Sequence, residues 1–227
     1  MTTLYFAPDN ASLVIRLVLE ELEVSYDTVL VDRSTREQES AAYKRLNPQG
    51  LIPVCVIDGE PVFETAAIAL LLADRHGGLA PAPANPARGR FLSWLFFASN
   101  TLHTGLRLVF YPHLVGNDPE AIRLAHARAR HAFGLLDAAY RAGDGPWLCD
   151  GTLSVVDLYA AVCLRWAQLY PADAPLMADL AQVPGLTRMA EALQERPAAF
   201  RAGAAEGITA PMMIGPTPPD GSRGAAV

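Results

Sequence analysis

The stretch NPQGLIPVCVIDGEPVFETAAIALLLADRHGG, residues 47–78, decides the fold. Two short apolar runs flank an Asp-Gly pair, which is a strong signal for a tight hairpin turn. A longer run with helical spacing follows and stops at a Gly-Gly pair. Asn47-Pro48 ends the preceding element, because a residue before proline avoids helical backbone. The stretch therefore predicts a ββα unit with strands at Pro53–Ile57 and Pro61–Phe63 and a helix at Glu64–His76.

The residues before this stretch alternate between strand and helix signals. Short β-rich runs at Thr3–Phe6 and Asp27–Asp32 predict two further strands, and helical spacing at Ser12–Leu22 and polar helix formers at Thr35–Leu46 predict two helices. The expected order is β-α-β-α-β-β-α. A βαβ unit followed by a ββα unit gives one mixed four-stranded sheet with helices packed on it.

Strand signals disappear after the Gly-Gly pair. Residues 78–86 carry three prolines among alanines and read as a stiff linker between a first domain, 1–77, and an all-helical domain, 87–206. Residues 207–227 hold four prolines and predict an irregular tail. The helices expected after the linker are Pro86–Val115, Pro119–Arg141, Ser154–Leu169, Pro184–Gln194 and Pro197–Ala205.

One helix start is unusually clear. Ser154 and Asp157 have the spacing of a capping box, with Asp in place of the usual Glu. Leu153 and Leu158 stand where a hydrophobic staple packs. This pattern predicts a helix beginning near Ser154, and its role is structural.

Composition narrows the classes of function. The chain has 227 residues, is 51% hydrophobic and carries a formal net charge of -6, so we expect a folded protein that does not bind nucleic acid or an anionic membrane through general basic charge. Its three cysteines are far apart, which predicts neither a disulfide framework nor a CxxC metal site. The histidines show no metal-ligand spacing, and no targeting signal is visible, so we expect a metal-free protein of the reducing cytoplasm.

The order of elements, the proline linker and three motifs together resemble the cytosolic glutathione S-transferases. Residues 47–53 resemble the NPxGxVP segment of that family, which ends in a cis-proline, and Phe63–Ile68 resembles its [E/Q]-[S/T]-x-x-I segment. Ser154–Asp157 resembles its buried helix cap. The match covers about Thr2 to Phe200, and the spacing around Leu102-His103 looks most like bacterial beta-type members. The resemblance implies a thioredoxin-like α/β N-terminal domain followed by an all-α domain.

The resemblance also implies a binding site for the tripeptide glutathione. A cis Ile52-Pro53 bond would let the Ile52 backbone pair with the tripeptide like an added strand. Glu64 and Thr65, at a helix start, would take the γ-glutamyl ammonium and carboxylate, although both types also serve simply as caps. Gln49 would donate to the glycyl end or remain a solvated loop side chain. The expected glutathione-binding residues are Gln49, Leu51, Ile52, Pro53, Glu64, Thr65 and His103.

The residue that activates the thiol is an open choice among three. The loop Ala7–Ser12 holds no cysteine, and Ala11 takes the place where beta-type members carry one, so disulfide exchange by a loop cysteine is excluded. Ser12 could donate its hydroxyl to a thiolate near a helix N-terminus. Tyr5 resembles the tyrosine of other classes, although a strand tyrosine is usually core. Asn10 is the third donor.

The resemblance predicts an enzyme that activates the thiol of glutathione for attack on a small apolar electrophile. The cofactor expectation is glutathione as cosubstrate with no metal, and the assembly expected by resemblance is a homodimer. Two alternatives stay open. One is a glutathione-fold binding or scaffold protein with little turnover, and the other is a glutathione-dependent isomerase or dehalogenase.

Overall fold

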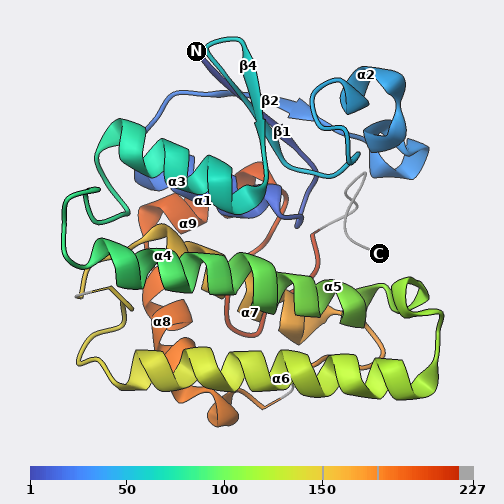
Figure 1. The fold of residues 1–227 in the computed structure, drawn as a ribbon, viewed down its shortest axis with the longest axis vertical. Coiled ribbons are helices and arrows are strands. Elements are labelled where there is room, and N and C mark those ends of the chain that lie inside the picture. Colours follow the sequence, from blue (N-terminus) through green and yellow to red (C-terminus); the bar gives the residue numbers. More distant parts are fainter. Residues whose placement is uncertain (150, 178, 220–227) are drawn as a thin grey trace. The chain divides into compact units, whose positions relative to one another are not determined.

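The computed structural model describes residues 1–149, 151–177 and 179–219. The chain forms two compact units (Figure 1). The first contains residues 1–80 with 196–212 and 217–219, and the second contains residues 81–195 with 213–216.

The first unit is built on a four-stranded sheet of order β2-β1-β3-β4. β1 (Thr2–Phe6) pairs in parallel with β2 (Asp27–Leu30) and antiparallel with β3 (Val54–Ile57), which pairs antiparallel with β4 (Glu60–Phe63). Asp58 and Gly59 both have positive φ, 52° and 92°, as a two-residue hairpin turn requires. The predicted mixed sheet is confirmed.

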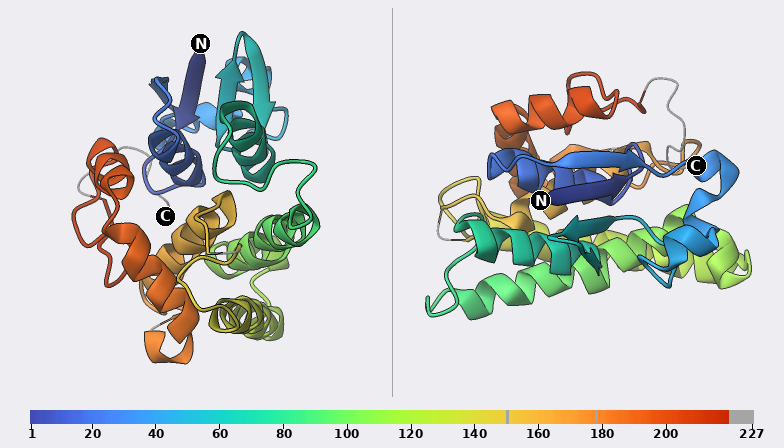
Figure 2. Two further views of the ribbon diagram at one scale, coloured as in Figure 1. Left: turned by 90° about the vertical axis from the view of Figure 1, so that its left-hand side faces the viewer. Right: turned by 90° about the horizontal axis from the view of Figure 1, so that it is seen from above.

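The two faces of the sheet are covered differently. Leu4 and Cys55 are fully buried on the face that carries α1 (Ser12–Glu21) and α3 (Thr65–His76), which lie side by side in Figures 1 and 2. The opposite face carries a smaller cluster of Val31, Tyr43 and Val54 under the segment between β2 and β3. Alternation along β1 therefore separates Leu4 from Tyr5.

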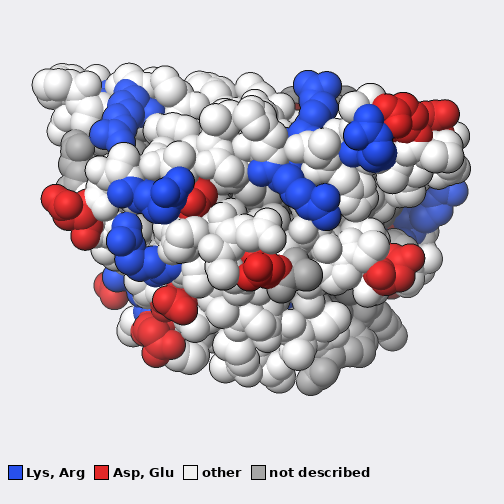
Figure 3. Space-filling view, turned by 90° about the horizontal axis from the view of Figure 1, so that it is seen from below, with Lys and Arg blue, Asp and Glu red and all other residues white. Residues whose placement is uncertain are grey.

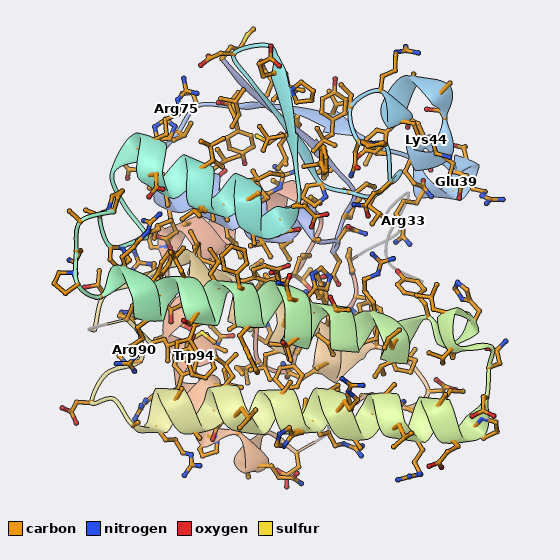
Figure 4. All side chains as sticks on the ribbon, in the orientation of Figure 1. Arg33, Glu39, Lys44, Arg75, Arg90 and Trp94 are labelled. Carbon is orange, nitrogen blue, oxygen red and sulfur yellow. The ribbon has the colours of Figure 1, made fainter. Side chains whose placement is uncertain are left out.

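The segment between β2 and β3 corrects the sequence prediction. A continuous helix was expected at Thr35–Leu46, but the structure has 3₁₀ turns at Arg33–Thr35 and Glu37–Glu39 and a single α-turn, α2 (Ala41–Lys44). Arg36 has φ +59°, and the Ser40 hydroxyl accepts from the Tyr43 amide at 3.1 Å. Short polar side chains here compete for the backbone groups that a helix would use. Figure 4 shows Arg33, Glu39 and Lys44 on this segment.

The second unit is helical, as predicted. α4 (Arg88–Phe97), a π-helical segment η3 (Ala98–His103) and α5 (Thr104–Phe110) form one rod, which ends before the 3₁₀ turn Pro112–Val115. The expected helix Pro86–Val115 is thus shorter, because Pro112 cannot continue it. α5 runs alongside α6 (Pro119–Arg141) in Figures 1 and 2, and Figure 4 places Arg90 and Trp94 on α4. α7 (Val155–Leu169) and α8 (Pro184–Gln194) complete the unit.

Charges of both signs occur on the surface. Basic and acidic side chains are interspersed on the face that Figure 3 shows. Within the described ranges, no helix is both long enough and apolar enough to cross a membrane.

The C-terminal elements divide differently from the sequence expectation. α9 (Pro197–Ala205) was expected in the helical domain, 87–206, but it groups with the first unit and packs on α1. Two ion pairs join these helices, Arg196 to Glu21 at 2.6 Å and Arg201 to Glu20 at 2.6 Å. Residues 207–219 form neither helix nor strand, and residues 220–227 of the expected tail lie outside the described residues.

The predicted capping box is present at the start of α7. Asp157 is fully buried, and its Oδ2 accepts from the Ser154 backbone amide at 2.7 Å and the Ser154 hydroxyl at 2.8 Å. Its Oδ1 accepts from the Tyr140 hydroxyl at 2.7 Å and the Leu148 amide at 2.9 Å. Burial raises the pKa of this carboxyl. One carboxylate therefore ties α7 to α6 and to the loop between them.

We expect Asp157→Ala to lower the free energy of unfolding by about 3 kcal/mol, because it strands several buried donors at once. Ser154→Ala should cost only about 1 kcal/mol. Urea unfolding followed by circular dichroism measures both. Ser93→Ala, at an exposed helical serine, is the control and should change stability by less than about 0.5 kcal/mol. Equal losses at positions 157 and 93 would contradict this account of the cap.

Candidate functional site

The register of the sheet brings three separate segments to one edge. Tyr5, Val54 and Phe63 form one row across β1, β3 and β4. Beyond this row, β1 ends at Phe6 and leads into the loop before α1, Pro53 directly precedes β3, and Glu64 directly follows β4 and precedes α3. The N-termini of two helices and the start of β3 therefore meet at this edge. Most of the predicted glutathione contacts belong to these segments.

The loop between β1 and α1 uses the Ser12 hydroxyl internally. Ser12 Oγ donates to the Ala7 carbonyl at 3.0 Å and accepts from the Ala7 amide at 3.3 Å, and Ser12 is fully buried. A hydroxyl has a single proton to donate, and here the Ala7 carbonyl takes it. This geometry speaks against the predicted role of Ser12 as the donor to a ligand sulfur and assigns it to closing the loop.

Asn10 keeps a free donor in the same loop. Its Oδ1 accepts from the Ala11 amide at 2.7 Å, and its carbonyl accepts from the Leu13 amide at 2.8 Å. Since a backbone N–H can only donate, the acceptor must be the side-chain oxygen, which fixes the orientation of the amide group. Within the described part of the chain the Nδ2 group has no protein partner, and Asn10 is half-buried. Both Nδ2 protons are therefore available to a ligand.

Tyr5 lies on the opposite side of the sheet from α1. Its ring meets the Tyr43 ring edge-on, with centroids 6.2 Å apart, and it packs against the cluster that contains Val31 and Val54. Burial raises the pKa of the neighbouring Tyr43 hydroxyl, which donates to the Leu51 carbonyl at 3.0 Å. These contacts favour the core reading of Tyr5 over a catalytic one.

The turn before β3 is held by Asn47. Its Nδ2 donates to the Leu51 carbonyl at 2.8 Å, and its Oδ1 accepts from the Gln49 amide at 3.1 Å. Gly50 has φ +65°, and a Cβ placed there would lie 2.9 Å from the Gln38 carbonyl oxygen. Both the backbone conformation and the close approach require glycine.

The turn leads into the predicted cis peptide. The Ile52-Pro53 bond is cis, as the motif indicated. Leu51 and Ile52 are half-buried, whereas Pro53 is buried. The Leu51 carbonyl is taken by Asn47 and Tyr43. Among the described residues no hydrogen bond occupies the Ile52 backbone N–H or C=O, so both remain open to an extended ligand backbone.

The start of α3 provides a charged and a hydroxyl group. Glu64 has φ +71° and ψ +116°, a conformation that costs about 1–3 kcal/mol for a residue with a side chain. The first amide of α3 with a backbone partner is that of Ile68, which donates to the Glu64 carbonyl at 3.0 Å. The amides of the three preceding residues are therefore unpaired within the helix, beside the Thr65 hydroxyl. Gln49 Nε2 reaches Glu64 Oε1 at 3.3 Å, which brings these predicted residues together.

His103 belongs to the second unit and is not among the residues of this sheet edge. Its Nδ1 lies 2.8 Å from the Tyr159 hydroxyl, and its ring centroid lies 5.2 Å from that of Trp166. Burial, followed by the positive charge of Arg107, lowers the pKa of His103 to about 4, so the imidazole is neutral at pH 7. Its contact with glutathione stays a prediction.

Sequence reasoning missed two charged residues that support the loop before α1. Arg16 on α1 and Glu206 after α9 are both buried, and Arg16 Nε donates to Glu206 Oε1 at 2.9 Å. Glu206 Oε2 accepts from the Asp9 amide at 2.9 Å. Glu206 stands at the expected domain end, and only the Glu-Gly pair at 206–207 signalled that a helix stops there. Within the described ranges, no three His, Cys, Asp or Glu side chains are arranged to hold a metal.

The family assignment rests on comparisons that agree with this geometry. The family model described as "Glutathione S-transferase, N-terminal domain" matches residues 11–75. A sphingomonad glutathione S-transferase, solved in complex with glutathione, is 30% identical, with a TM-score of 0.77 over 91% of this chain and 100% of its own. This chain belongs to the glutathione S-transferase family.

Two further proteins similar to this chain support the family assignment. The bacterial beta class glutathione S-transferase of Sphingomonas chungbukensis is 30% identical, with a TM-score of 0.76 over 90% of this chain and 98% of its own. A curated Escherichia coli (strain K12) relative named "Disulfide-bond oxidoreductase YfcG" is 29% identical over 89% of this chain and 94% of its own length. The thioredoxin-like fold and the resemblance drawn from the three motifs are confirmed.

We expect Gly50→Ala to lower the free energy of unfolding by about 3 kcal/mol, because it adds a steric clash to a left-handed conformation that itself costs about 1–2 kcal/mol. Gly77→Ala is the matched control: its φ is +73°, but nothing lies within 4 Å of the added Cβ. Thermal or urea unfolding of the two variants isolates the clash. If Gly77→Ala is as destabilising as Gly50→Ala, the approach to Gln38 is unimportant.

Proposed function

We propose that this chain binds glutathione along the edge formed by Ile52, Glu64 and Thr65 and ionises its thiol for attack on a small apolar electrophile. The observation that carries the proposal is the open Ile52 backbone, aligned by the sheet register with the unpaired amides at the start of α3. An extended tripeptide needs backbone partners along its middle and an anion site at one end. Membership of the family supports the same assignment.

Each end of the tripeptide has a partner of matching chemistry. The γ-glutamyl carboxylate binds the Thr65 hydroxyl and the first amides of α3, where the helix dipole favours negative charge. Glu64 takes the γ-glutamyl ammonium. We assign the glycyl end to Gln49, whose Nε2 must leave its 3.3 Å contact with Glu64 Oε1 to reach it. Leu51 and Pro53 shape the backbone between these ends.

Asn10 is the group we assign to the sulfur. A free thiol of this type has a pKa near ~8.5, so the site must stabilise the thiolate to make it abundant at neutral pH. In the described structure the Nδ2 of Asn10 is an unoccupied side-chain donor of this loop, whereas the Ser12 hydroxyl proton is taken by the Ala7 carbonyl. The N-terminus of α1 adds a favourable dipole. The thiolate then forms a carbon–sulfur bond with the electrophile, whose leaving group departs with the bonding electrons.

The name of the Escherichia coli relative favours a second candidate reaction. The same bound thiolate can attack a disulfide sulfur instead of carbon, forming a mixed disulfide and releasing the other sulfur as a thiolate. The loop before α1 has no cysteine, so glutathione itself supplies the nucleophile in this reaction. We further propose a homodimer and a cytoplasmic location, both carried over from the family.

Titration calorimetry tests the binding step. We expect the wild-type chain to bind glutathione and Thr65→Val to weaken binding by about 1–2 kcal/mol, or roughly 5–30-fold in Kd, because an isosteric methyl cannot pair with the carboxylate. Thr65→Ser keeps the hydroxyl and is the control. No heat with the wild type would remove the proposed function. Binding without turnover of a chloronitrobenzene or a small disulfide would favour the scaffold alternative.

The ultraviolet absorbance of bound glutathione thiolate tests the sulfur contact. We expect Asn10→Ala to raise the pKa of the bound thiol by about one unit, which is the value of one lost hydrogen bond to an anion. Asn10→Asp keeps the bond to the Ala11 amide but replaces the donor by a charge, so it should raise that pKa further. Ser12→Ala should leave it unchanged while lowering stability by about 1 kcal/mol. A raised thiol pKa in Ser12→Ala alone would restore the original prediction.

A further inference from the structure

The C-terminal end of α9 is a fixed turn that presents one carboxylate. The Ile208 amide donates to the Gly203 carbonyl at 2.9 Å and the Gly207 amide to the Ala204 carbonyl at 3.4 Å, with Gly207 at φ +67°. These two bonds form a Schellman motif, in which the last helical residues are locked. A Cβ at Gly203 would lie 3.3 Å from the Ile208 carbonyl oxygen, so glycine permits the chain to return closely. Glu206 is the capping residue of this turn.

Glu206 connects this turn to the loop before α1. Its side chain is fully buried, and its two oxygens have separate partners, Arg16 Nε and the Asp9 amide, each at 2.9 Å. Asp9 is fully buried and has φ +50°, a left-handed conformation that is unfavourable for a residue with a side chain. A charge-assisted hydrogen bond to its amide stabilises that conformation. The residue that follows is Asn10.

Arg16 provides the positive charge that stabilises the buried carboxylate of Glu206. Its guanidinium stacks over the Phe6 ring at 4.4 Å, and its Nη1 donates to the Tyr26 hydroxyl at 3.2 Å. Its Nη2 is buried with no hydrogen-bond partner in the described structure. A buried ion pair that leaves a donor unsatisfied is an expensive way to gain stability. Since stability alone does not account for the pair, we infer that its role is to hold the Asp9-Asn10 turn in place.

We propose that Glu206 is a positioning residue, whose carboxylate holds the Asp9 amide so that the Asn10 side-chain amide is aimed at the sulfur of glutathione. The proposal rests on the proposed function for its consequence in catalysis, but not for the link between Glu206 and the turn. The C-terminal segment thereby sets the geometry of a loop about 200 positions earlier in the chain.

The protonation state of Glu206 should change near neutral pH. Burial outweighs the attraction of Arg16 and raises the pKa of Glu206 to about 7. The charged groups that face it are Arg16 on α1 and Asp9 in the loop, and Asp9 adds to the upward shift. Tyr26, one contact further away, has its own pKa raised to about 12 and stays neutral. Below neutral pH the carboxylate gains a proton, and its bonds to Arg16 and Asp9 weaken.

Amide hydrogen exchange tests the link without any ligand. In Glu206→Gln the side chain keeps one acceptor but must turn an NH₂ group toward either Arg16 or the Asp9 amide, both of which are donors. We expect exchange of the Asp9 amide to become about tenfold faster, because a local opening that the carboxylate opposed becomes easier. Arg196→Gln, which breaks an ion pair between α9 and α1 without touching the turn, is the matched control. Unchanged exchange at Asp9 in Glu206→Gln overturns the proposal.

The thiolate absorbance of bound glutathione tests the consequence. We expect Glu206→Gln to raise the pKa of the bound thiol by about half a unit or more, lowering kcat/KM by up to roughly threefold at pH 7.5, where most of the wild-type Glu206 is ionised, with little change in Kd. The rise should vanish in an Asn10→Ala background, because the two residues act through one contact. The pH profile of the wild type should carry a step near pH 7 that Glu206→Gln lacks.

The outcomes separate the two proposals. A lower thiol pKa in Glu206→Gln means that the residue acts only as a nearby charge, and a rise that persists in Asn10→Ala means that it acts through another group; either overturns positioning. Equal effects in Arg196→Gln assign the result to a loosened α9 and also overturn it. If the wild type does not bind glutathione, the proposed function fails, while the exchange of the Asp9 amide still decides whether Glu206 holds the turn.

Discussion

The antiparallel register of β1, β3 and β4 is the constraint on which the candidate site depends. Tyr5, Val54 and Phe63 share one row, so Pro53 before β3, Glu64 after β4 and the end of β1 come to the same end of the sheet although the segments are far apart in sequence. A shift by one residue would turn every side chain to the opposite face and move Leu4 and Cys55 out of the core. The burial that stabilises the sheet therefore also aligns the open Ile52 backbone with the start of α3.

The hydrogen bonds already formed within the protein determine which polar groups at this end of the sheet can still bind a ligand. Ser12 and Asn10 both carry a side-chain hydrogen-bond donor beside a helix N-terminus, so the sequence does not show which of them could bind a ligand. Ser12 donates its one hydroxyl proton to the Ala7 carbonyl. Asn10 accepts from the Ala11 amide through its Oδ1, which leaves its Nδ2 available as a donor. The same reasoning separates Leu51, whose carbonyl is doubly occupied, from Ile52. Function here follows from what local structure leaves unsatisfied.

The C-terminal segment extends the first unit beyond its contiguous sequence. α9 is docked on α1 by ion pairs at Glu20 and Glu21, and the turn after it places Glu206 against Asp9. A loop that follows a strand usually has few supports of its own. In this chain a buried carboxylate from the other end supplies one, at the cost of burying an arginine beside it.

Local chemistry determined much of this protein from sequence alone. The Asp58-Gly59 turn, the glycine stop after α3 and the cap at Asp157 were predicted because each depends on residues that are neighbours in the chain, whereas the cis bond before Pro53 was predicted from the family resemblance of residues 47–53. Helix at Thr35–Leu46 was wrong, since polar side chains captured the backbone groups. Only the tertiary structure decided that Ser12 is occupied, that Tyr5 belongs to a core cluster and that Glu206 supports Asp9. Each of these findings depends on a contact that forms only when the loops fold, the strands pair and α9 packs on α1. The spacing of residues in the sequence does not predict which side chains come into contact in this way.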